Sequence, residues 1–158
     1  MKVCVLQPDY STTGVDYKNY DPPRDLAPLL PDDEVHNVFL NKLTTYKQLK
    51  DLSKQGFDIF VNLCEGYLEW EIPSIDVIYT LELLNLPFTG PTTKLYDPPK
   101  ELMKYLAFCE RVKTPGYVII NELNDVDDAV KHLSFPLFVK PSKAGDSLGV
   151  DELSLVNN

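Results

Sequence analysis

The sequence contains few of the residues that build disulfide scaffolds or zinc sites. Its 158 residues include three cysteines and two histidines. Cys4, Cys64 and Cys109 stand far apart, without a Cys-x-x-Cys pair or a Cys/His metal spacing. This spacing excludes a zinc ribbon and a disulfide-stapled scaffold. Because all three cysteines have apolar neighbours, we expect buried free thiols.

Positive charge and long apolar runs are also scarce. Lysine and arginine number 15 against 24 acidic residues, a formal net charge of −9, and they form no basic cluster. Nucleic acid and anionic membranes are therefore not expected as partners. No stretch reaches the roughly 18 apolar residues of a membrane span, and the apolar run after Met1 is too short for a signal peptide. We expect a globular, cytoplasmic protein whose 44% apolar residues suffice for a core.

Proline is abundant, and it marks one long irregular segment. Five of the 13 prolines lie between residues 8 and 33, where we predict a loop. Loops of this length are either functional or disordered, so a binding lid and an inserted segment both remain open.

Around this loop the sequence alternates between two patterns. Short apolar, β-branched runs predict strands, and apolar residues three and four positions apart predict helices. Strands are predicted at 2–7, 35–40, 57–63 and 86–90, and helices at 44–54 and 72–84. This alternation is typical of an α/β fold with a parallel, doubly wound, Rossmann-like sheet.

A second region begins where proline and threonine interrupt the periodicity at residues 91–99. We place a domain boundary there, which gives domains at 1–90 and 91–158. The second domain is predicted to contain helices at 98–112 and 125–133 and strands at 117–120 and 137–140.

The most informative stretch follows an apolar run at 135–139, which is typical of a strand inside a sheet. Lys140 ends the run. A polar loop follows, and it contains small residues that allow close approach of a ligand: Gly145, Ser147 and Gly149. Because backbone amides in such a loop attract anions, we interpret it as a phosphate-binding loop. A plain hairpin turn is the alternative, since the loop lacks the Gly-Lys-Ser/Thr of a P-loop.

Three further side chains have both a functional and a structural interpretation. Glu65 follows the strand predicted at 57–63, so it is either a substrate contact or a loop carboxylate. Lys104 is a surface cation on the basis of its surroundings alone. Cys64 as the nucleophile of a hydrolase would need a nearby base, and neither histidine is obviously placed to serve.

Six short motifs stand in a definite order along the chain: Asn62-Leu63-Cys64-Glu65-Gly66, Leu86-Pro87-Phe88-Thr89-Gly90, Lys100-x-x-x-Lys104, Thr114-Pro115-Gly116-Tyr117, Phe135-Pro136-Leu137-Phe138-Val139-Lys140-Pro141 and Asp146-Ser147-Leu148-Gly149. In this order they resemble the ATP-grasp superfamily, and specifically its D-alanine–D-alanine ligase-like branch. The resemblance implies a Rossmann-like pre-ATP-grasp domain at 1–90 and the first, incomplete lobe of an ATP-grasp fold at 91–158.

The resemblance also implies an activity and its cofactors. Enzymes of this branch use ATP and Mg²⁺ to phosphorylate a carboxylate, and an amine then attacks the acylphosphate. Phosphoryl transfer needs positive charge around the developing negative oxygens. Lys104 and Lys140 are implied to contact the nucleotide phosphates, and the loop from Lys143 to Gly149 to cover them. The expected ligands are thus a nucleotide and a small carboxylate or amine.

The sequence departs from this branch in three places. Residues 6–10, Leu-Gln-Pro-Asp-Tyr, replace a glycine-serine-glutamate loop that binds D-alanine, which favours a different substrate. Asp146 brings a carboxylate to the expected phosphates, where the ligases often have serine. The chain ends at Asn158, before a second lobe that would supply a catalytic arginine and metal ligands. We therefore assign no catalytic or metal-binding residue and expect the chain alone to be inactive.

A non-catalytic interaction or regulatory module derived from an ATP-grasp protein is the alternative. In that case a homo-oligomer would cover the apolar surface that a missing lobe leaves exposed.

Overall fold

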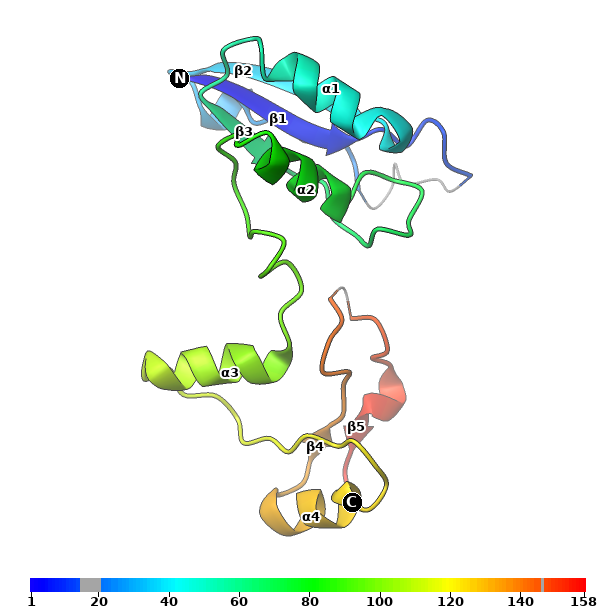
Figure 1. Cartoon of the computed structure of the whole chain (residues 1–158). Coiled ribbons are helices and arrows are strands. Elements are labelled where there is room, and N and C mark those ends of the chain that lie inside the picture. The colour runs from blue at the N-terminus through cyan, green and yellow to red at the C-terminus, as the bar shows by residue number, and fades with distance from the viewer. Residues whose placement is uncertain (15–20, 146) are drawn as a thin grey trace. The chain divides into compact units, whose positions relative to one another are not determined.

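A computed structural model of the chain describes residues 1–14, 21–145 and 147–158. Its contacts form two compact units, Met1–Tyr96 and Asp97–Asn158, whose helices and strands are labelled in Figure 1. The division falls after residue 96, whereas the sequence placed it after residue 90.

The first unit is built on a parallel sheet. β1 (Lys2–Pro8) lies between β2 (Glu34–Leu40) and β3 (Ile59–Asn62), and both pairings are parallel. The strands predicted at 2–7 and 35–40 are confirmed, and the third is shorter than predicted. In place of a fourth strand, Phe88 forms one isolated parallel bridge with Phe60, since Pro87 has no N–H with which to extend the ladder.

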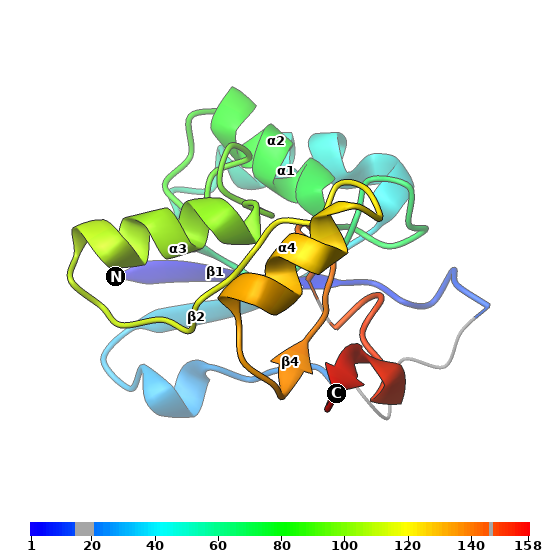
Figure 2. The same ribbon diagram turned by 90° about the horizontal axis from the view of Figure 1, so that it is seen from below.

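Helices cover one face of this sheet. α1 (Thr45–Leu52) and α2 (Ile75–Leu83) lie side by side on it, and Figure 2 shows residues 21–33 of the connection between β1 and β2 on the opposite face. In its described part that connection contains only the 3-10 turn Ala27–Leu29. The α/β class is confirmed, and the parallel sheet is consistent with a Rossmann-like start.

The core of the first unit lies between the sheet and the two helices. Its buried side chains come from every element of the layer: Cys4, Leu6, Leu40, Leu49, Leu52, Phe60, Cys64, Val77 and Leu81. β1 is buried from Val3 to Pro8, as expected for a central strand covered on both faces. The prediction of buried thiols is confirmed for Cys4 and Cys64 but is wrong for Cys109, which is exposed.

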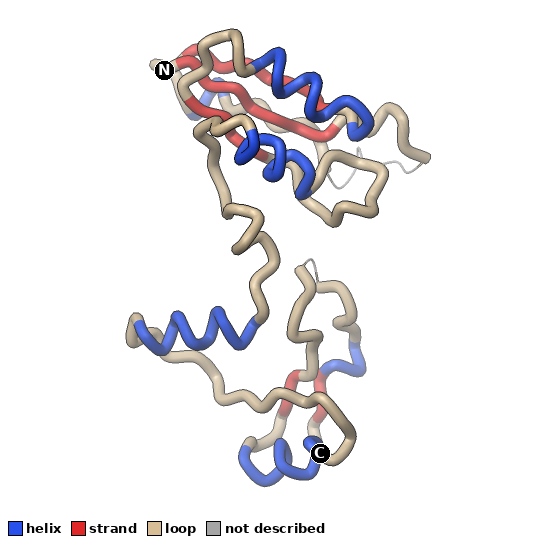
Figure 3. Tube along the Cα trace, in the orientation of Figure 1, coloured by secondary structure: helices blue, strands red, loops and turns tan. Residues whose placement is uncertain are grey.

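The second unit has little regular structure, as the tan tube in Figure 3 shows. It contains α3 (Lys100–Cys109), α4 (Asp125–His132) and an antiparallel pair of short strands, β4 (Leu137–Phe138) and β5 (Leu155–Val156). A 3-10 turn, Glu152–Ser154, precedes β5. The strand predicted at 117–120 is wrong, because that segment has no hydrogen-bonded neighbouring strand.

Burial in the second unit contradicts one prediction. The run at 135–139 was expected inside a sheet, but Phe138 and Val139 are 54% and 59% exposed. A two-stranded ribbon has no second layer packed against it, so its side chains stay in solvent. Across the described part of this unit, Ser154 is the only buried residue.

No helix in the described part of the chain has the length and apolar character needed to cross a membrane.

Candidate functional site

The first candidate region is the edge of the parallel sheet where β1 and β3 end. Residues 21–33, which lead into β2, lie on one face of the sheet, and the chain leaves β3 toward α2 on the other face (Figures 1 and 2). Neighbouring parallel strands with opposite exits mark a switch point, the usual ligand site of an open α/β sheet. Asp9, after β1, and Glu65, after β3, therefore stand at the expected position for substrate contacts.

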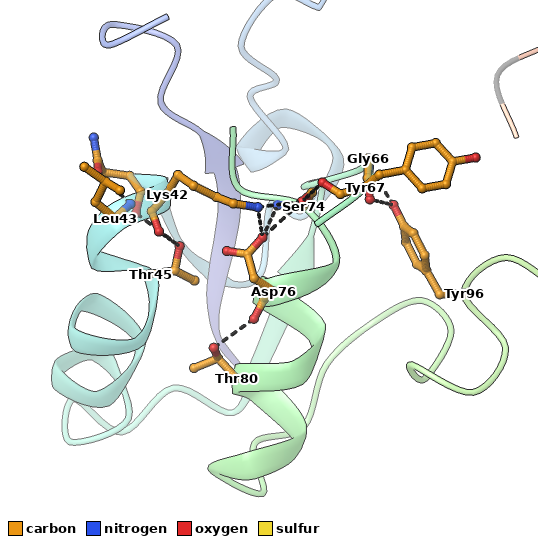
Figure 4. A network of polar contacts seen from close by, with 10 residues as sticks. Lys42, Leu43, Thr45, Gly66, Tyr67, Ser74, Asp76, Thr80 and Tyr96 are labelled. Atoms are coloured by element: carbon orange, nitrogen blue, oxygen red, sulfur yellow. Dashed lines mark hydrogen bonds and ion pairs between the residues drawn. The ribbon is translucent and has the colours of Figure 1, made fainter. Parts of the chain in front are cut away.

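The segment after β3 is held in one conformation. The Gly66 N–H donates to the Tyr96 hydroxyl at 2.6 Å, and that hydroxyl is 3.0 Å from the Gly66 carbonyl oxygen (Figure 4). Gly66 has a φ of +124°, and a Cβ there would stand 2.3 Å from the Trp70 ring. Glycine is therefore required at this position. The neighbouring Glu65 is exposed, and its carboxylate has no hydrogen-bond partner within the described ranges.

A lysine, a serine and an aspartate form a network of polar contacts next to this edge (Figure 4). Lys42 Nζ lies 2.6 Å from Asp76 Oδ1 and 2.9 Å from Ser74 Oγ, and both charged side chains are less than one fifth exposed. The Ser74 hydroxyl in turn reaches the Tyr67 carbonyl oxygen at 2.7 Å. These contacts join the chain after β2 to the first turn of α2 and to the loop after β3.

The network also fixes the charge of Asp76. Burial by itself would raise the pKa of this carboxyl, but the hydrogen bond from Lys42 and those from Ser74 outweigh burial, and the pKa lies below its usual value. Asp76 is therefore ionised at neutral pH. We interpret Asp76 as a structural residue, because Lys42 and Ser74 are both bonded to its Oδ1.

The segment that returns from β1 to β2 is attached to the sheet by Gln7. The buried Gln7 side chain accepts from the Arg24 N–H at 2.6 Å and donates to the Arg24 carbonyl oxygen at 3.0 Å. Tyr10 is hydrogen-bonded to Asp21 in the same segment. These hydrogen bonds attach the described part of the long loop to the sheet. Gln7 and Tyr10, which belong to the residues that replace the glycine-serine-glutamate loop, therefore make structural contacts. Residues 15–20 lie outside the described ranges.

The hydrolase interpretation of Cys64 is not supported. The side chain is 1% exposed, and burial, together with the charges of Asp76 and Asp21, raises the pKa of its thiol well above the usual value. His36 lies 2.6 Å from Glu34 on the exposed edge strand β2, and His132 contacts the Asp128 carbonyl oxygen in the second unit. A thiolate at Cys64 is therefore disfavoured, and neither histidine serves it as a base.

The second candidate region is the connection between β4 and β5, residues 139–154. Its two ends meet where the Val139 N–H donates to the Ser154 carbonyl oxygen at 2.8 Å. This connection joins antiparallel neighbours, as a hairpin does, but it far exceeds the roughly two to five residues of ordinary hairpin loops. The loop at 142–149 is therefore part of a longer connection than a plain hairpin turn, and its phosphate-binding role stays a prediction.

The first turn of α3 holds one end of this loop. The Lys100 N–H donates to the Ser142 carbonyl oxygen at 2.9 Å, and Lys100 Nζ reaches the Ala144 carbonyl oxygen at 2.9 Å. The Ser142 hydroxyl donates to Glu101 Oε2 at 2.6 Å. At the other end Gly149 has a φ of +72°, and a Cβ there would stand 2.7 Å from the ring of Pro141.

Three curated relatives show what the chain resembles. It is 31% identical to the D-alanine–D-alanine ligase of Nitrosomonas eutropha over 66% of this chain and 34% of that protein. The D-alanine–D-alanine ligase of Delftia acidovorans is 30% identical over 68% of this chain and 32% of its own length. D-alanine–D-alanine ligase B of Chromobacterium violaceum is 30% identical over 68% of this chain and 35% of its own length.

The chain is related to the D-alanine–D-alanine ligases. The resemblance read from its motifs is thereby confirmed. It spans about a third of the length of the curated relatives that it matches. No protein-family model and no solved structure matches it.

In this relative of the D-alanine–D-alanine ligases, two predicted phosphate contacts lie on the loop of the second unit. Lys140 and Lys143 are exposed, and the charge of Lys143 acts on the carboxylate of Glu101. Lys140 Nζ lies 5.9 Å from the Phe138 ring centre. Ser147 has a left-handed φ of 58°, and Gly145 and Gly149 flank it. Asp146 lies outside the described residues.

The other predicted contact, Lys104, faces a different segment. Its Nζ donates to the Pro115 carbonyl oxygen at 2.7 Å and lies 5.0 Å from the Tyr117 ring centre. Lys100, one turn earlier on α3, contacts the loop at 139–154, and this contact was not predicted from the sequence. The two lysines are four residues apart and share a helix face, so the motif alone did not distinguish them. The role of Lys104 at a phosphate stays a prediction.

Proposed function

We propose that the chain carries nucleotide- and substrate-binding parts of an ATP-dependent carboxylate–amine ligase that acts through an acylphosphate. The observation that carries this proposal is that one long loop contains two exposed lysines and is contacted by a third. Lys140 and Lys143 belong to the loop, and Lys100 reaches it from α3. In an acidic chain with a net charge of −9, such a group of lysines suits a polyanionic ligand.

The residues present fit the phosphates of a nucleotide. Lysine ammonium groups are compact point charges that bind phosphate oxygens through charge-assisted hydrogen bonds. Gly145 and Gly149 let the backbone approach closely. For Mg²⁺ we assign no ligand, because no group of three or more metal-ligating side chains occurs in the described ranges.

The proposed chemistry has two steps. ATP supplies the γ-phosphoryl group, which passes to an oxygen of the substrate carboxylate and leaves ADP. The amine nitrogen of the second substrate then attacks the carbonyl carbon, the carbon–oxygen bond to phosphate breaks, and the nitrogen loses a proton. Lys140 and Lys143 hold the phosphates and offset their negative charge. Glu65, at the edge of the parallel sheet, contacts the substrate.

D-alanine is the substrate that the names of the relatives suggest, and it is the first to test. Because Gln7 is committed to Arg24, this part of the edge does not reproduce the glycine-serine-glutamate loop. We propose that another small amino or hydroxy acid takes the place of one D-alanine.

Titration with Mg·ADP at millimolar concentration, followed by NMR, tests the nucleotide site. We expect shifts at residues 140–149 of the loop. The Lys140→Ala and Lys143→Ala variants should each bind about tenfold more weakly, the equivalent of one charge-assisted hydrogen bond of about 1.5 kcal/mol.

Lys113→Ala is the matched control, because Lys113 is an exposed lysine of the same unit outside the loop. Its affinity should equal that of the unchanged chain. Absence of loop-selective shifts, or equal losses in all three variants, would contradict the nucleotide proposal.

A non-catalytic interaction or regulatory module is the second candidate. It is favoured by the absence of any buried apolar side chain in the described part of the second unit, because exposed apolar surface of this extent marks contact sites. Light scattering measures whether the chain forms a homo-oligomer, which would cover the exposed apolar surface of the second unit. A monomer at all concentrations, together with loop-selective nucleotide binding, would reject this candidate.

A further inference from the structure

Glu101 stands where the first turn of α3 meets the loop at 139–154. Its carboxylate accepts a hydrogen bond from the Ser142 hydroxyl at 2.6 Å, while the backbone N–H of the preceding Lys100 donates to the Ser142 carbonyl oxygen at 2.9 Å. Ser142 is therefore held through both its main chain and its side chain. These residues are 41 or more positions apart in the sequence, so the contact is tertiary.

The other end of the loop has contacts that do not involve Glu101. Gly149 packs against Pro141, and Asp151 and Ser154 form a reciprocal capping box that starts the 3-10 turn before β5. Between these two attachments lies a short tip in which the Leu148 N–H donates to the Gly145 carbonyl oxygen at 3.0 Å. Lys143 lies directly between Ser142 and Ala144. The hydrogen bonds of Ser142 with Glu101 and Lys100 therefore determine the position of the Lys143 backbone.

We propose that Glu101 is a positioning residue for this loop, and that through Ser142 it places Lys143 for contact with the phosphates of a nucleotide. The second half of this statement rests on the proposed function. A carboxylate this near a phosphate site would weaken anion binding if it were unpaired. The Ser142 hydroxyl, the Glu101 N–H and the nearby Lys143 and Lys100 charges all lower the pKa of Glu101, and they offset that repulsion.

A purely structural role for Glu101 makes different predictions. Glu101 lies in the first turn of α3, where negative charge stabilises any helix through the macrodipole. Loss of that effect would loosen α3 whether or not the loop is attached. Variants that separate charge from hydrogen bonding therefore distinguish the two roles.

The experiment measures backbone amide order parameters by NMR in the chain without nucleotide. In Glu101→Ala and in Ser142→Ala, we expect the order parameters of the Lys143 and Ala144 amides to fall from about 0.85 to below about 0.6. The double variant should lose no more than either single variant, because both remove the same bond. Glu101→Gln keeps an acceptor for Ser142 without the charge, so it should retain an ordered loop.

Glu110→Ala is the control, because Glu110 is an exposed carboxylate at the other end of α3. In Glu110→Ala the loop at 139–154 should remain ordered. The proposal is overturned if Glu101→Gln loosens α3 as Glu101→Ala does while Ser142→Ala leaves the loop ordered, since that pattern belongs to the macrodipole.

A second readout separates this proposal from the function on which it rests. With Mg·ADP, Glu101→Ala should bind more weakly, and Glu101→Gln should bind like the unchanged chain. If loop order follows the pattern above but no variant binds Mg·ADP, Glu101 positions the loop and the nucleotide function is wrong. If Mg·ADP binds equally to all variants, the positioning of Lys143 by Glu101 is rejected while the nucleotide function stands.

Discussion

The two units contain similar apolar patterns, but they differ in what those patterns bury. In the first unit, the sheet and the helices α1 and α2 enclose a continuous core around Leu6 and Phe60. In the second, the apolar side chains of α3 are exposed, with Leu106 at 50% and Phe108 at 79%. A helix or strand buries an apolar face only when a second layer covers it. The first unit has that layer within its own residues.

This difference changes what holds each candidate region in place. The edge of the parallel sheet stands on a packed core, and the Lys42–Asp76 pair adds to it. The loop of the second unit depends on hydrogen bonds to α3 and on Gly149 packed against Pro141. We therefore expect core substitutions to act strongly in the first unit and weakly in the second.

Leu6→Ala should produce the largest effect. Leu6 is fully buried in β1, so its truncation removes apolar contacts and leaves a cavity, at a cost of about 2–5 kcal/mol. Urea denaturation followed by circular dichroism measures this cost. Leu106→Ala in α3 is the matched control, and because that side chain is half exposed it should change stability by less than about 0.5 kcal/mol. Equal costs for the two variants would mean that α3 is covered in solution, and the comparison between the units would fail.

Gly66→Ala should follow in size. The new Cβ would clash with the Trp70 ring at a φ of +124°, which we expect to cost about 1–3 kcal/mol and to lower the melting temperature of the first unit. Gly149→Ala in the second unit creates a similar conflict with Pro141 at a φ of +72°. Its effect should stay in the loop, where NMR shifts would report it without a change in melting. A lowered melting temperature for Gly149→Ala would show that the loop belongs to a packed core.

The core of the first unit was the part most predictable from the sequence. The apolar run of β1 and the spacing of Leu49 and Leu52 directly indicate a covered strand and a helix face, and the structure contains both. In the second unit the same reasoning predicted a buried run at 135–139 that is exposed. Apolar periodicity reports which side chains can be buried, and it does not report whether a layer is present to bury them.

The candidate regions were predictable in position but not in their supports. A loop was predicted after the strand at 137–140, and the structure has one after β4; Glu65 was predicted to follow a strand, and it follows β3. The binding roles of Lys140, Lys143 and Glu65 stay predictions. The contacts that hold these regions join residues far apart in the sequence, such as Lys42 to Asp76 at 34 positions and Ser142 to Glu101 at 41. Local propensity and spacing carry no information about such pairs. A lysine two residues after β2 and a Ser-x-Asp at the start of α2 were the available signals for the first of them.

Asp76→Asn should have an intermediate effect with a characteristic pH dependence. The pKa of Asp76 in the folded chain lies below its usual value, so its ionised form stabilises the fold fully above the unfolded pKa of about 3.9. That contribution is lost as the pH falls through the lower, folded pKa. At neutral pH we expect Asp76→Asn to cost about 1–3 kcal/mol, because Lys42 then lies in a largely buried site without its ionic partner.

The control for this pair is Asp51→Asn on α1. Asp51 pairs with Lys54 at 2.9 Å, but both side chains are more than half exposed, and solvent screens the pair. We expect no measurable change. Stability curves for Asp76→Asn and the unchanged chain should converge as the pH falls below the folded pKa of Asp76. Curves that stay parallel down to that pH would show that the ionic contact contributes nothing.

Tyr96→Phe should produce the smallest change in stability and the most local one. The substitution keeps the ring and removes the hydroxyl that contacts both the N–H and the carbonyl oxygen of Gly66, for a loss of about 1 kcal/mol. Hydrogen exchange should quicken at the Gly66 amide and remain unchanged along β1, where the core protects the backbone. Tyr79→Phe on α2 removes a hydroxyl from a half-exposed ring and should leave both rates as they are. If Tyr96→Phe accelerated exchange throughout β1, the edge and the core would open as one unit. The edge would then unfold cooperatively with the core, and it could not be changed without also changing the stability of the core.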